Sequence, residues 1–274
     1  MKKHQKNRKP TVIYFVMLYN SHSKEVVMTM SHKKIKKQRT MLYFMQAAKE
    51  IVNTEGMQAI TIRKVADIAG YNSATLYNYF ENLDQLIAFA MIHTITDYLS
   101  DLETIINLDL NALDKYLLMW RCYSDWSFKD PEIYTYVFDS EKSDEILSHM
   151  DAYNTTFPMH KTKPAKHISD LVLGQGMKRR NQLSIDPCVE VGYFKADDVS
   201  TIVNFAYIMH QGIIRRILKG SYTNDNDHVE EFLNYFVSFL GQYDQKMSIN
   251  DDTVKNILEF DIHKKHIQPK RELT

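Results

Sequence analysis

The chain has 274 residues, of which 44% are hydrophobic and 25% are charged, and its formal net charge is zero. This composition supports one or two folded domains and excludes an intrinsically disordered protein. The charge is unevenly distributed: residues 1–30 carry six Lys/Arg and one Asp/Glu, residues 31–83 carry eight and four, and residues 84–274 carry 20 and 29. A basic amino-terminal part therefore precedes an acidic remainder, which predicts a polyanion-binding module followed by a domain with another task.

The composition also limits the compartment and the chemistry. Cys122 and Cys188 are the only cysteines, so reduced thiols are expected, and no cysteine pair has zinc-ligand spacing. The apolar run 12–19 is too short to span a bilayer, and no small-residue cleavage site follows it. We expect a cytoplasmic protein without membrane association, metal or cofactor.

Residues 1–30 differ from the rest of the chain, because they are basic and lack helical periodicity. Two interpretations remain open. Lys24-Glu25-Val26 can be encoded by codons that resemble a bacterial ribosome-binding sequence, just upstream of Met28 and Met30, so translation could begin at one of these methionines. The alternative is a genuine disordered extension.

From residue 35 onward the apolar pattern is helical. Phe44, Ala48, Ile51 and Val52 recur with helical spacing, and Gly56 is placed as a left-handed stop. A helix-turn-helix spanning about 61–80 follows. Thr61 is the expected N-cap of its first helix, over 62–69, and Ile60 and Val65 form the expected hydrophobic staple. Gly70 lies in the turn, and Asn72 or Ser73 caps a second helix that continues to about Phe80. Asp84 begins the next helical segment, which continues through Ile95.

The remaining pattern predicts an all-α fold. Further helices are expected at 111–128, 131–139, 143–153, 166–183, 197–219 and 226–243. Loops are expected at 154–165 and 184–196, which contain Pro158, Pro164, Pro187 and Gly192. The tail 246–274 would add at most one short helix, within 251–267 and with Val254, Ile257 and Leu258 on one face.

The helix-turn-helix separates into packing residues and outward residues. Val65, Ala66, Ala69 and Leu76 supply the apolar contact between the two helices. The outward set is Arg63 and Lys64 on the first helix and Ser73, Thr75, Tyr77, Asn78 and Tyr79 on the second. Short polar and aromatic side chains of this kind can hydrogen-bond to base edges and phosphates and pack on thymine methyl groups.

Over positions 44–86, with the segments QAAKEIVNTEG and TIRKVADIAGYNSATLYNYFENLDQL, the chain resembles the tetracycline-repressor (TetR/AcrR) family. The resemblance implies a three-helix DNA-binding module at 31–83 and a larger helical-bundle effector and dimerisation domain at 84–245. It further implies that the second motif helix enters the major groove. Thr61, Tyr77 and Tyr79 would then hold the DNA backbone, while Arg63, Ser73, Thr75 and Asn78 reach bases.

One position departs from the family pattern. The family usually carries a phosphate-binding Lys after the Tyr-Phe pair, and Leu83 stands in its place. Charge could come instead from a basic arm before the first helix, in which Lys36 and Lys37 are the main candidates, with Lys33, Lys34 and Arg39 beside them.

The acidic domain contains candidates for an effector pocket and for a dimer interface. The effector candidates are aromatic or imidazole side chains: Trp120, Tyr123, Trp126, Tyr134, Phe138 and His210. The dimer candidates form two stripes, one of Ile202, Phe205, Ala206, Met209, Ile213 and Ile214, the other of Phe232, Tyr235, Phe236 and Phe239. Ordinary core packing is the alternative for every one of these residues.

The sequence therefore predicts a homodimeric, ligand-responsive regulator: a repressor that a small, lipophilic effector releases from double-stranded operator DNA. A helical interaction protein that has lost DNA binding is the alternative. An enzyme is not expected, because the nucleophile-elbow, P-loop, dinucleotide-binding and HExxH motifs are all missing. His160, His167 and Asp170 are better explained as surface-loop residues than as metal ligands.

Overall fold

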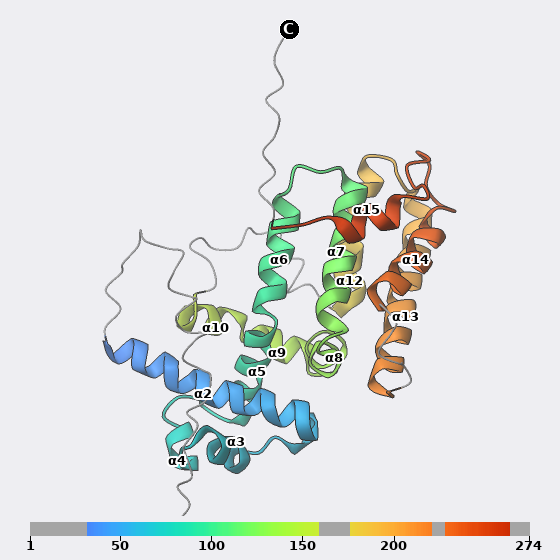
Figure 1. The fold of residues 1–274 in the computed structure, drawn as a ribbon. Coiled ribbons are helices and arrows are strands. Elements are labelled where there is room, and N and C mark those ends of the chain that lie inside the picture. Colours follow the sequence, from blue (N-terminus) through green and yellow to red (C-terminus); the bar gives the residue numbers. More distant parts are fainter. Residues whose placement is uncertain (1–31, 159–175, 221–227, 264–274) are drawn as a thin grey trace, which may run out of the picture. The chain divides into compact units, whose positions relative to one another are not determined.

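The computed structural model describes residues 32–158, 176–220 and 228–263, and every regular element in these ranges is helical (Figure 1). The α-helices are α2 (His32–Glu55), α3 (Ile62–Ala69), α4 (Ser73–Leu76), α5 (Leu83–Thr94), α6 (Thr96–Asn107), α7 (Ala112–Ser127), α8 (Pro131–Asp139), α9 (Ser143–Ser148), α10 (Met150–Thr156), α12 (Gly176–Glu190), α13 (Val199–Leu218), α14 (His228–Leu240) and α15 (Thr253–Glu259); η1 (Met57–Ala59) and η2 (Ala196–Asp198) are 3₁₀ turns. The all-α prediction is confirmed. None of the described helices is long and apolar enough to cross a membrane.

The chain divides into two compact units, 1–40 and 41–274, with the boundary inside α2. In the first unit, residues 32–40 are helical, and Lys33, Lys34, Lys36, Lys37 and Arg39 are exposed. The prediction of an arm before the first helix was therefore wrong, because these basic residues form the first turns of the helix itself. Lys, Arg and Gln favour helix, and no Gly or Pro interrupts the run.

In the second unit, residues 41–80 build the small helical module. Phe44 is fully buried, and its ring centroid lies 5.1 Å from that of Tyr71 and 6.2 Å from that of Phe80. Val65, Ala66 and Leu76 are also fully buried, as the helix-turn-helix pattern predicts. A shared apolar core thus joins the second half of α2 to α3 and α4.

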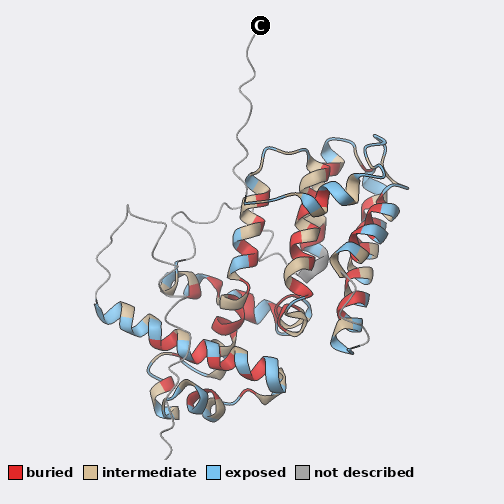
Figure 2. Ribbon diagram, viewed as in Figure 1, coloured by how far each residue is buried: buried red, intermediate tan, exposed pale blue. Residues whose placement is uncertain are grey.

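Helix α7 is the central element of the larger bundle. It contacts α6, α8, α12, α14 and α15, and α13 packs in turn against α12 and α14 (Figure 1). Figure 2 shows buried residues along most of α7, which is consistent with neighbours on several sides. Cys122 on α7 and Cys188 on α12 are both buried and free, as expected for reduced thiols.

Four helices differ from the prediction in this region. Helix α6 was not predicted, although Tyr98, Leu99, Leu102 and Ile105 form its buried stripe. The expected helix 143–153 is divided into α9 and α10 at His149, whose N–H bonds to the carbonyl of Ile146 (3.1 Å) in a tightened turn. The tail helix α15 exists but is shorter than the range 251–267 expected for it, and residues 264–267 lie outside the described residues.

The expected loop at 184–196 was wrong in its first half, because α12 continues to Glu190 through Pro187. Proline lacks the N–H that would bond to the carbonyl four residues earlier, and its ring crowds that carbonyl, so the helix tolerates Pro187 at the cost of at least one hydrogen bond. Ile185 and Cys188 are fully buried and hold this part of the helix in the core. The helix ends where Gly192 takes a φ of 81° and the Tyr193 N–H bonds to the Cys188 carbonyl (2.8 Å).

Some predictions lie outside the described residues. These are the extension 1–30, most of the loop 154–165, the first ten residues of the helix expected at 166–183, and His160, His167 and Asp170.

Candidate nucleic-acid interface and aromatic cluster

The first helix of the motif begins as its sequence predicts. Thr61 is extended and its Oγ1 accepts the Lys64 N–H at 3.3 Å, while its carbonyl accepts the Val65 N–H at 3.0 Å. Ile60 and Val65, the two members of the expected hydrophobic staple, are both buried. The direction in which α3 starts is therefore fixed by a side-chain cap and an apolar contact.

The turn between the two motif helices is built on Gly70 and Asn72. Gly70 adopts the left-handed conformation (φ 77°, ψ 29°), and the Tyr71 N–H bonds to the Ala66 carbonyl at 2.9 Å. Asn72 is the N-cap of α4, because its Oδ1 accepts the Thr75 N–H at 2.8 Å. Both local signals in the sequence are confirmed, with Asn72 rather than Ser73 as the cap.

The second motif helix is shorter than expected. Helix α4 ends at Leu76 rather than near Phe80, and the following residues form tight turns in which the N–H groups of Asn78 and Tyr79 bond to the carbonyls three residues earlier. Bonds of this type tighten the end of a helix. Leu76 and Phe80 stay buried across the turn, so Tyr77 and Asn78 are held at the surface.

The predicted DNA-contacting residues are either exposed or half-buried. Thr61, Arg63, Tyr77 and Asn78 are exposed, and the Tyr77 side chain is 56% accessible. Ser73 and Thr75 are half-buried, and the Thr75 Oγ1 donates to Asn72 Oδ1 at 2.9 Å, so this hydroxyl supports the cap. Tyr79 is also half-buried, with its ring centroid 6.0 Å from that of Phe44. Lys36 and Lys37 are exposed on α2.

The two basic side chains of α3 differ in the length of their ion pairs. Lys64 Nζ forms a 2.6 Å ion pair with Glu55, whereas Arg63 has only a loose 3.9 Å contact with Asp67 across an exposed turn. An exposed pair of this length contributes little to stability. Arg63 can therefore exchange Asp67 for a phosphate or a base, while Lys64 is held by the module itself.

Leu83 lies at the first position of α5, and the helix start is capped without a cation. Asn82 Oδ1 accepts the Gln85 N–H at 2.8 Å, and Gln85 Oε1 accepts the Glu81 N–H at 2.9 Å. Leu83 packs half-buried against the core. Because Glu81 and Asp84 flank it, this helix start has less to offer a phosphate than the family pattern implies.

Two contacts not anticipated from the sequence link the motif module to α8. Glu132 Oε1 accepts the Met57 N–H at 2.8 Å, and Lys49 Nζ forms a 3.2 Å ion pair with Asp130. Asp130 and Glu132 flank Pro131 at the start of α8, where carboxylates suit the helix dipole. A proline-initiated helix with acidic residues was visible in the sequence, but the partners at positions 49 and 57 were not.

The structure brings five of the six effector candidates into one cluster. Trp120, Tyr123, Tyr134, Phe138 and His210 are all buried, and their rings form a connected set of contacts. Trp126 does not join them, because its Nε1 donates to Asp101 at 2.9 Å and Lys129 lies over its ring. We call these five residues the aromatic cluster.

Further residues complete the surroundings of the aromatic cluster. Tyr98 of α6 contacts Tyr123, Tyr134 and Phe138 with ring centroids 5.8–5.9 Å apart. Arg180 of α12 is buried; its guanidinium lies 4.3 Å from the centre of the Phe138 ring, and it donates to the Phe138 carbonyl at 3.1 Å. Tyr98 was not among the predicted effector residues because helix α6, which carries it, was not predicted. Arg180 was missed because it stands in a polar Lys-Arg-Arg-Asn run that is typical of a solvated helix face.

The tyrosines and the histidine of the cluster are uncharged, and Arg180 is the cation beside them. Burial raises the pKa of Tyr98, Tyr123 and Tyr134, which therefore remain protonated. Burial lowers the pKa of His210 to about 3, so the imidazole is neutral, and its Nε2 lies 3.0 Å from Ser127 Oγ. In this cluster Tyr134 Oη and the nearby Ser124 Oγ are buried without a hydrogen-bond partner in the described part of the chain.

The predicted dimer stripe on α13 is mostly core. Ile202, Ala206, Ile213 and Ile214 are buried within the single chain, so the core alternative holds for them. The large apolar or aromatic side chains that α13 and α14 do expose are Ile208 (67% accessible), Leu218 at the end of α13 (50%) and Tyr235 (59%). Between the two helices, Phe205 and Phe239 stack with centroids 3.7 Å apart and are half-buried.

Two short helices with a left-handed glycine turn, packed on a preceding helix, define a helix-turn-helix DNA-binding domain. Residues 44–88 match the model of the family described as bacterial regulatory proteins, tetR family. Residues 44–88 therefore form a DNA-binding domain of the TetR family, as the resemblance of this segment to that family implied. No curated protein matches it.

Three solved structures match this chain at low sequence identity. RolR in complex with resorcinol is 14% identical, with 83% of this chain and 98% of that chain covered and a TM-score of 0.48. A TetR family transcription regulator from Marinobacter aquaeolei VT8 is 19% identical (75% and 96% covered, TM-score 0.46). Thermus thermophilus FadR in complex with lauroyl-CoA is 12% identical (73% and 92% covered, TM-score 0.42).

Proposed function

We propose that this regulator is a homodimeric repressor that a small, lipophilic effector releases from its operator. The observation that carries the proposal is the surface of residues 71–80. It follows a correctly capped turn, contains no Asp, Glu, Lys or Arg, and exposes Tyr77 and Asn78. An uncharged polar surface on a recognition element suits base edges and phosphate oxygens, which hydrogen-bond to hydroxyl and amide groups.

We assign a role at the DNA to each residue from how exposed its side chain is. Tyr77 and Asn78 are the residues we assign to direct contact, together with Arg63 and the N-cap Thr61. Ser73 and Thr75 lie closer to the module and would contact DNA with one edge only, and Tyr79 would position Tyr77 by packing on Phe44. Lys36 and Lys37 would contribute sequence-independent attraction to phosphates.

The aromatic cluster is our candidate effector site. Its walls are apolar and aromatic, and Tyr134 Oη and Ser124 Oγ offer polar groups that the described protein does not itself satisfy. Buried polar groups normally find a partner, so unpartnered hydroxyls among packed rings favour a site that a ligand completes. Trp126 is excluded from this site because its indole N–H is bound to Asp101.

Helix α8 would transmit the effect of ligand binding from the aromatic cluster to the DNA-binding helices. This helix carries Tyr134 and Phe138 of the cluster, and Glu132, in its first turn, bonds to the Met57 N–H. A ligand that separates the rings would shift α8, and Glu132 and Asp130 would pass that shift to η1 and α2. Release then requires the ligand to bind the displaced arrangement more tightly than the DNA-binding one.

Dimerisation would use the outer faces of α13 and α14. Ile208 and Tyr235 are large apolar or aromatic side chains that the single chain leaves more than half exposed, one on each helix. Two-fold symmetry would place two recognition elements one helical turn of DNA apart.

Fluorescence anisotropy with DNA from upstream of the protein's own gene tests the DNA-binding proposal. We expect tight binding that weakens steeply with salt and exceeds binding to scrambled DNA by at least about 10³-fold, a typical specificity ratio. Equal affinity for both DNAs at every salt concentration would favour the alternative, a helical interaction protein that has lost operator recognition.

A thermal-shift screen with lipophilic cations, fatty acids and acyl thioesters tests the effector proposal. A hit should release the operator in the anisotropy assay, and Phe138→Ala should weaken its binding whereas Trp126→Phe should not. A ligand whose binding is equally unaffected by both substitutions lies elsewhere, and the cluster is then ordinary core.

A further inference from the structure

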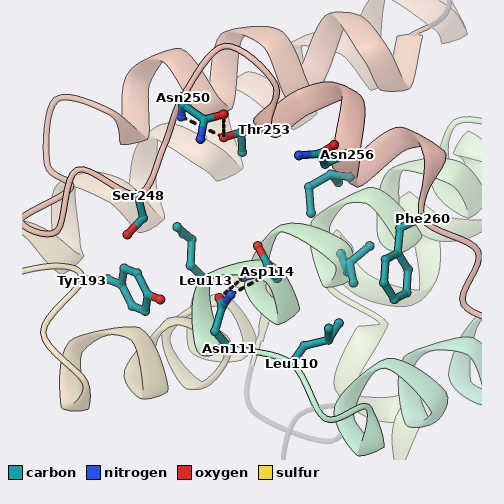
Figure 3. Close-up of a pocket in the computed structure, with 12 residues that line it drawn as sticks. Leu110, Asn111, Leu113, Asp114, Tyr193, Ser248, Asn250, Thr253, Asn256 and Phe260 are labelled. Carbon is teal, nitrogen blue, oxygen red and sulfur yellow. Dashed lines mark hydrogen bonds between the residues drawn. The ribbon is translucent and has the colours of Figure 1, made fainter. Parts of the chain in front are cut away.

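The carboxyl-terminal segment forms a partly open cavity of about 330 Å³ against the start of α7 (Figure 3). One wall comes from residues 110–118 and the other from residues 248–260, with Tyr193 beside them. This volume is at the lower end of the range for small-molecule sites. None of the lining residues belongs to the aromatic cluster, so the cavity is separate from the candidate effector site.

The cavity combines an apolar floor with a polar rim. Leu113, Leu118 and Ile257 are buried and form the floor. In Figure 3, Asn250, Thr253 and Asn256 project from the α15 side, opposite Asn111 and Asp114 on the α7 side. The ring of Tyr193 lies on one flank of the space and that of Phe260 on the other.

The polar groups of the rim are partly unused. Tyr193 Oη, Ser248 Oγ and the Asn256 amide form no side-chain hydrogen bond within the described residues. One oxygen of Asp114 accepts from Asn111 Nδ2 at 2.7 Å, and the other has no hydrogen-bond partner in the described ranges. Ser248 and Asn256 are exposed and Tyr193 and Asp114 are half-buried, so these groups are accessible to a ligand from three segments of the chain.

The charge of the cavity has one sign. Asp114 is the only charged residue among the lining residues that the structure describes; the Lys246 ammonium group lies beside them, 4.5 Å from the centre of the Tyr193 ring. Acidic residues also dominate the adjoining segments, which contain Asp109, Asp251, Asp252, Glu259 and Asp261 against Lys115 and Lys255. Lys115 Nζ donates to the Ile106 carbonyl at 3.0 Å and forms no ion pair with Asp114 within the described residues. A cation is favoured over an anion in these surroundings.

The walls are fixed before any ligand arrives. Arg121 of α7 donates through Nη1 to the carbonyl of Ile257 at 2.8 Å and to that of Phe260 at 2.6 Å. At the other end of α15, Thr253 Oγ1 accepts the Asn250 N–H at 2.9 Å. Groups already held in place lose less entropy when a ligand binds.

We propose that this cavity binds a small organic cation, a primary amine that carries a ring or a short apolar chain. Its ammonium group pairs with the free oxygen of Asp114 and bonds to amide oxygens of the rim. Its apolar part lies on Leu113 and Ile257, beside the ring of Phe260. The regulator then has a second ligand site, walled by α15, in addition to the effector site in the bundle.

Isothermal titration calorimetry of the full-length protein with tyramine, agmatine and putrescine tests this proposal, with glutarate as the anionic counterpart. We expect saturable binding of at least one amine and none of glutarate. Asp114→Asn should weaken amine binding about tenfold or more, since a charge-assisted contact is lost. The matched control is Asp109→Asn, which removes an exposed carboxylate five residues away that does not line the cavity.

Asp114 also stands near the start of α7, so each variant is first checked for an unchanged thermal unfolding midpoint. Asn256→Leu provides a second probe of amine binding, from the opposite wall of the cavity. Tyr134→Phe, in the aromatic cluster, should leave amine binding unchanged. The proposal is overturned if no amine binds at millimolar concentration, if the Asp109 and Asp114 variants lose affinity equally, or if Tyr134→Phe alone abolishes binding.

Discussion

Glu132 Oε1 accepts the main-chain N–H of Met57 at 2.8 Å, so a carboxylate at the start of α8 caps the 3₁₀ turn that leads into the DNA-binding motif. Glu132→Ala would leave this half-buried N–H without its acceptor, and we expect the free energy of unfolding to fall by about 1–3 kcal/mol. Glu132→Gln retains an acceptor oxygen and should recover most of the loss. Urea denaturation measures both, and equal losses in the two variants would show that the charge, not the hydrogen bond, matters.

Gly56 and Gly70 both have positive φ but in different regions. Gly70 (φ 77°, ψ 29°) is left-handed, and a Cβ added there would meet no atom within 4 Å, so Gly70→Ala should cost about 1 kcal/mol. Gly56 (φ 85°, ψ 166°) was expected to be left-handed too, but it lies in a region that is essentially restricted to glycine, and a Cβ there would meet Glu132 Oε1 at 3.3 Å. Gly56→Ala should therefore destabilise more than Gly70→Ala in thermal unfolding; the reverse order would contradict this conformation.

Tyr77 is the most informative single substitution at the proposed DNA surface. It is 56% exposed, so Tyr77→Ala should leave the unfolding midpoint nearly unchanged. Operator binding should weaken by about 1–3 kcal/mol in fluorescence anisotropy. Met247→Ala, on a side chain that is 92% exposed and far along the chain, is the control and should not alter affinity. Unchanged operator affinity in the Tyr77 variant would mean that this surface does not face DNA.

Lys36 and Lys37 should act on all DNA sequences alike. For Lys36→Gln/Lys37→Gln we expect weaker binding to operator and scrambled DNA in similar proportion, and a slope of log affinity against log salt that is smaller by about 2. Lys219→Gln/Lys255→Gln removes two exposed charges from the acidic domain and should change neither quantity. A loss confined to the operator would instead assign a base-reading role to α2.

His210 should make the protein less stable in acid. Burial lowers its pKa in the folded state to about 3, whereas the unfolded value is 6.5. The unfolded state therefore takes up the proton first as the pH falls, so this contribution to stability is complete above pH 6.5 and declines below it by about 1.4 kcal/mol per pH unit. Between about pH 7 and pH 5 the loss is about 2 kcal/mol.

His210→Gln should flatten that pH dependence in urea denaturation while keeping a polar partner for Ser127. His93 also has a pKa lowered by burial, but it is present in both proteins and cancels in the comparison. If the variant and the original chain lose the same stability over this pH range, His210 is not the residue responsible.

The helix-turn-helix could be predicted from sequence because its determinants are local. Thr61, Gly70 and Asn72 each act within three or four residues of themselves, and all three cap or turn the chain as their residue types indicate. The positions of DNA-facing residues were less predictable. Thr75 and Tyr79 are outward by helical spacing, yet one supports a cap and the other packs on Phe44, since α4 ends early.

The errors elsewhere come from contacts between distant residues. Pro187 signals a loop locally, but the burial of Ile185 and Cys188 outweighs the loss of one hydrogen bond. Arg180 looks solvated in its own segment, and only the folded chain places it over the Phe138 ring. Five of six effector candidates were brought together because aromatic residues collect in cores, which is also why sequence alone could not separate a binding site from ordinary packing.

Arg121 holds α15 through main-chain carbonyls, and these are the one feature that every residue type supplies. The hydrogen bonds that hold α15 to Arg121 therefore do not depend on which side chains α15 carries. Substitution of Asn256 or its neighbours on the cavity wall would therefore leave the attachment of α15 to Arg121 intact, and proteins that keep this arginine can differ in the side chains that line the cavity.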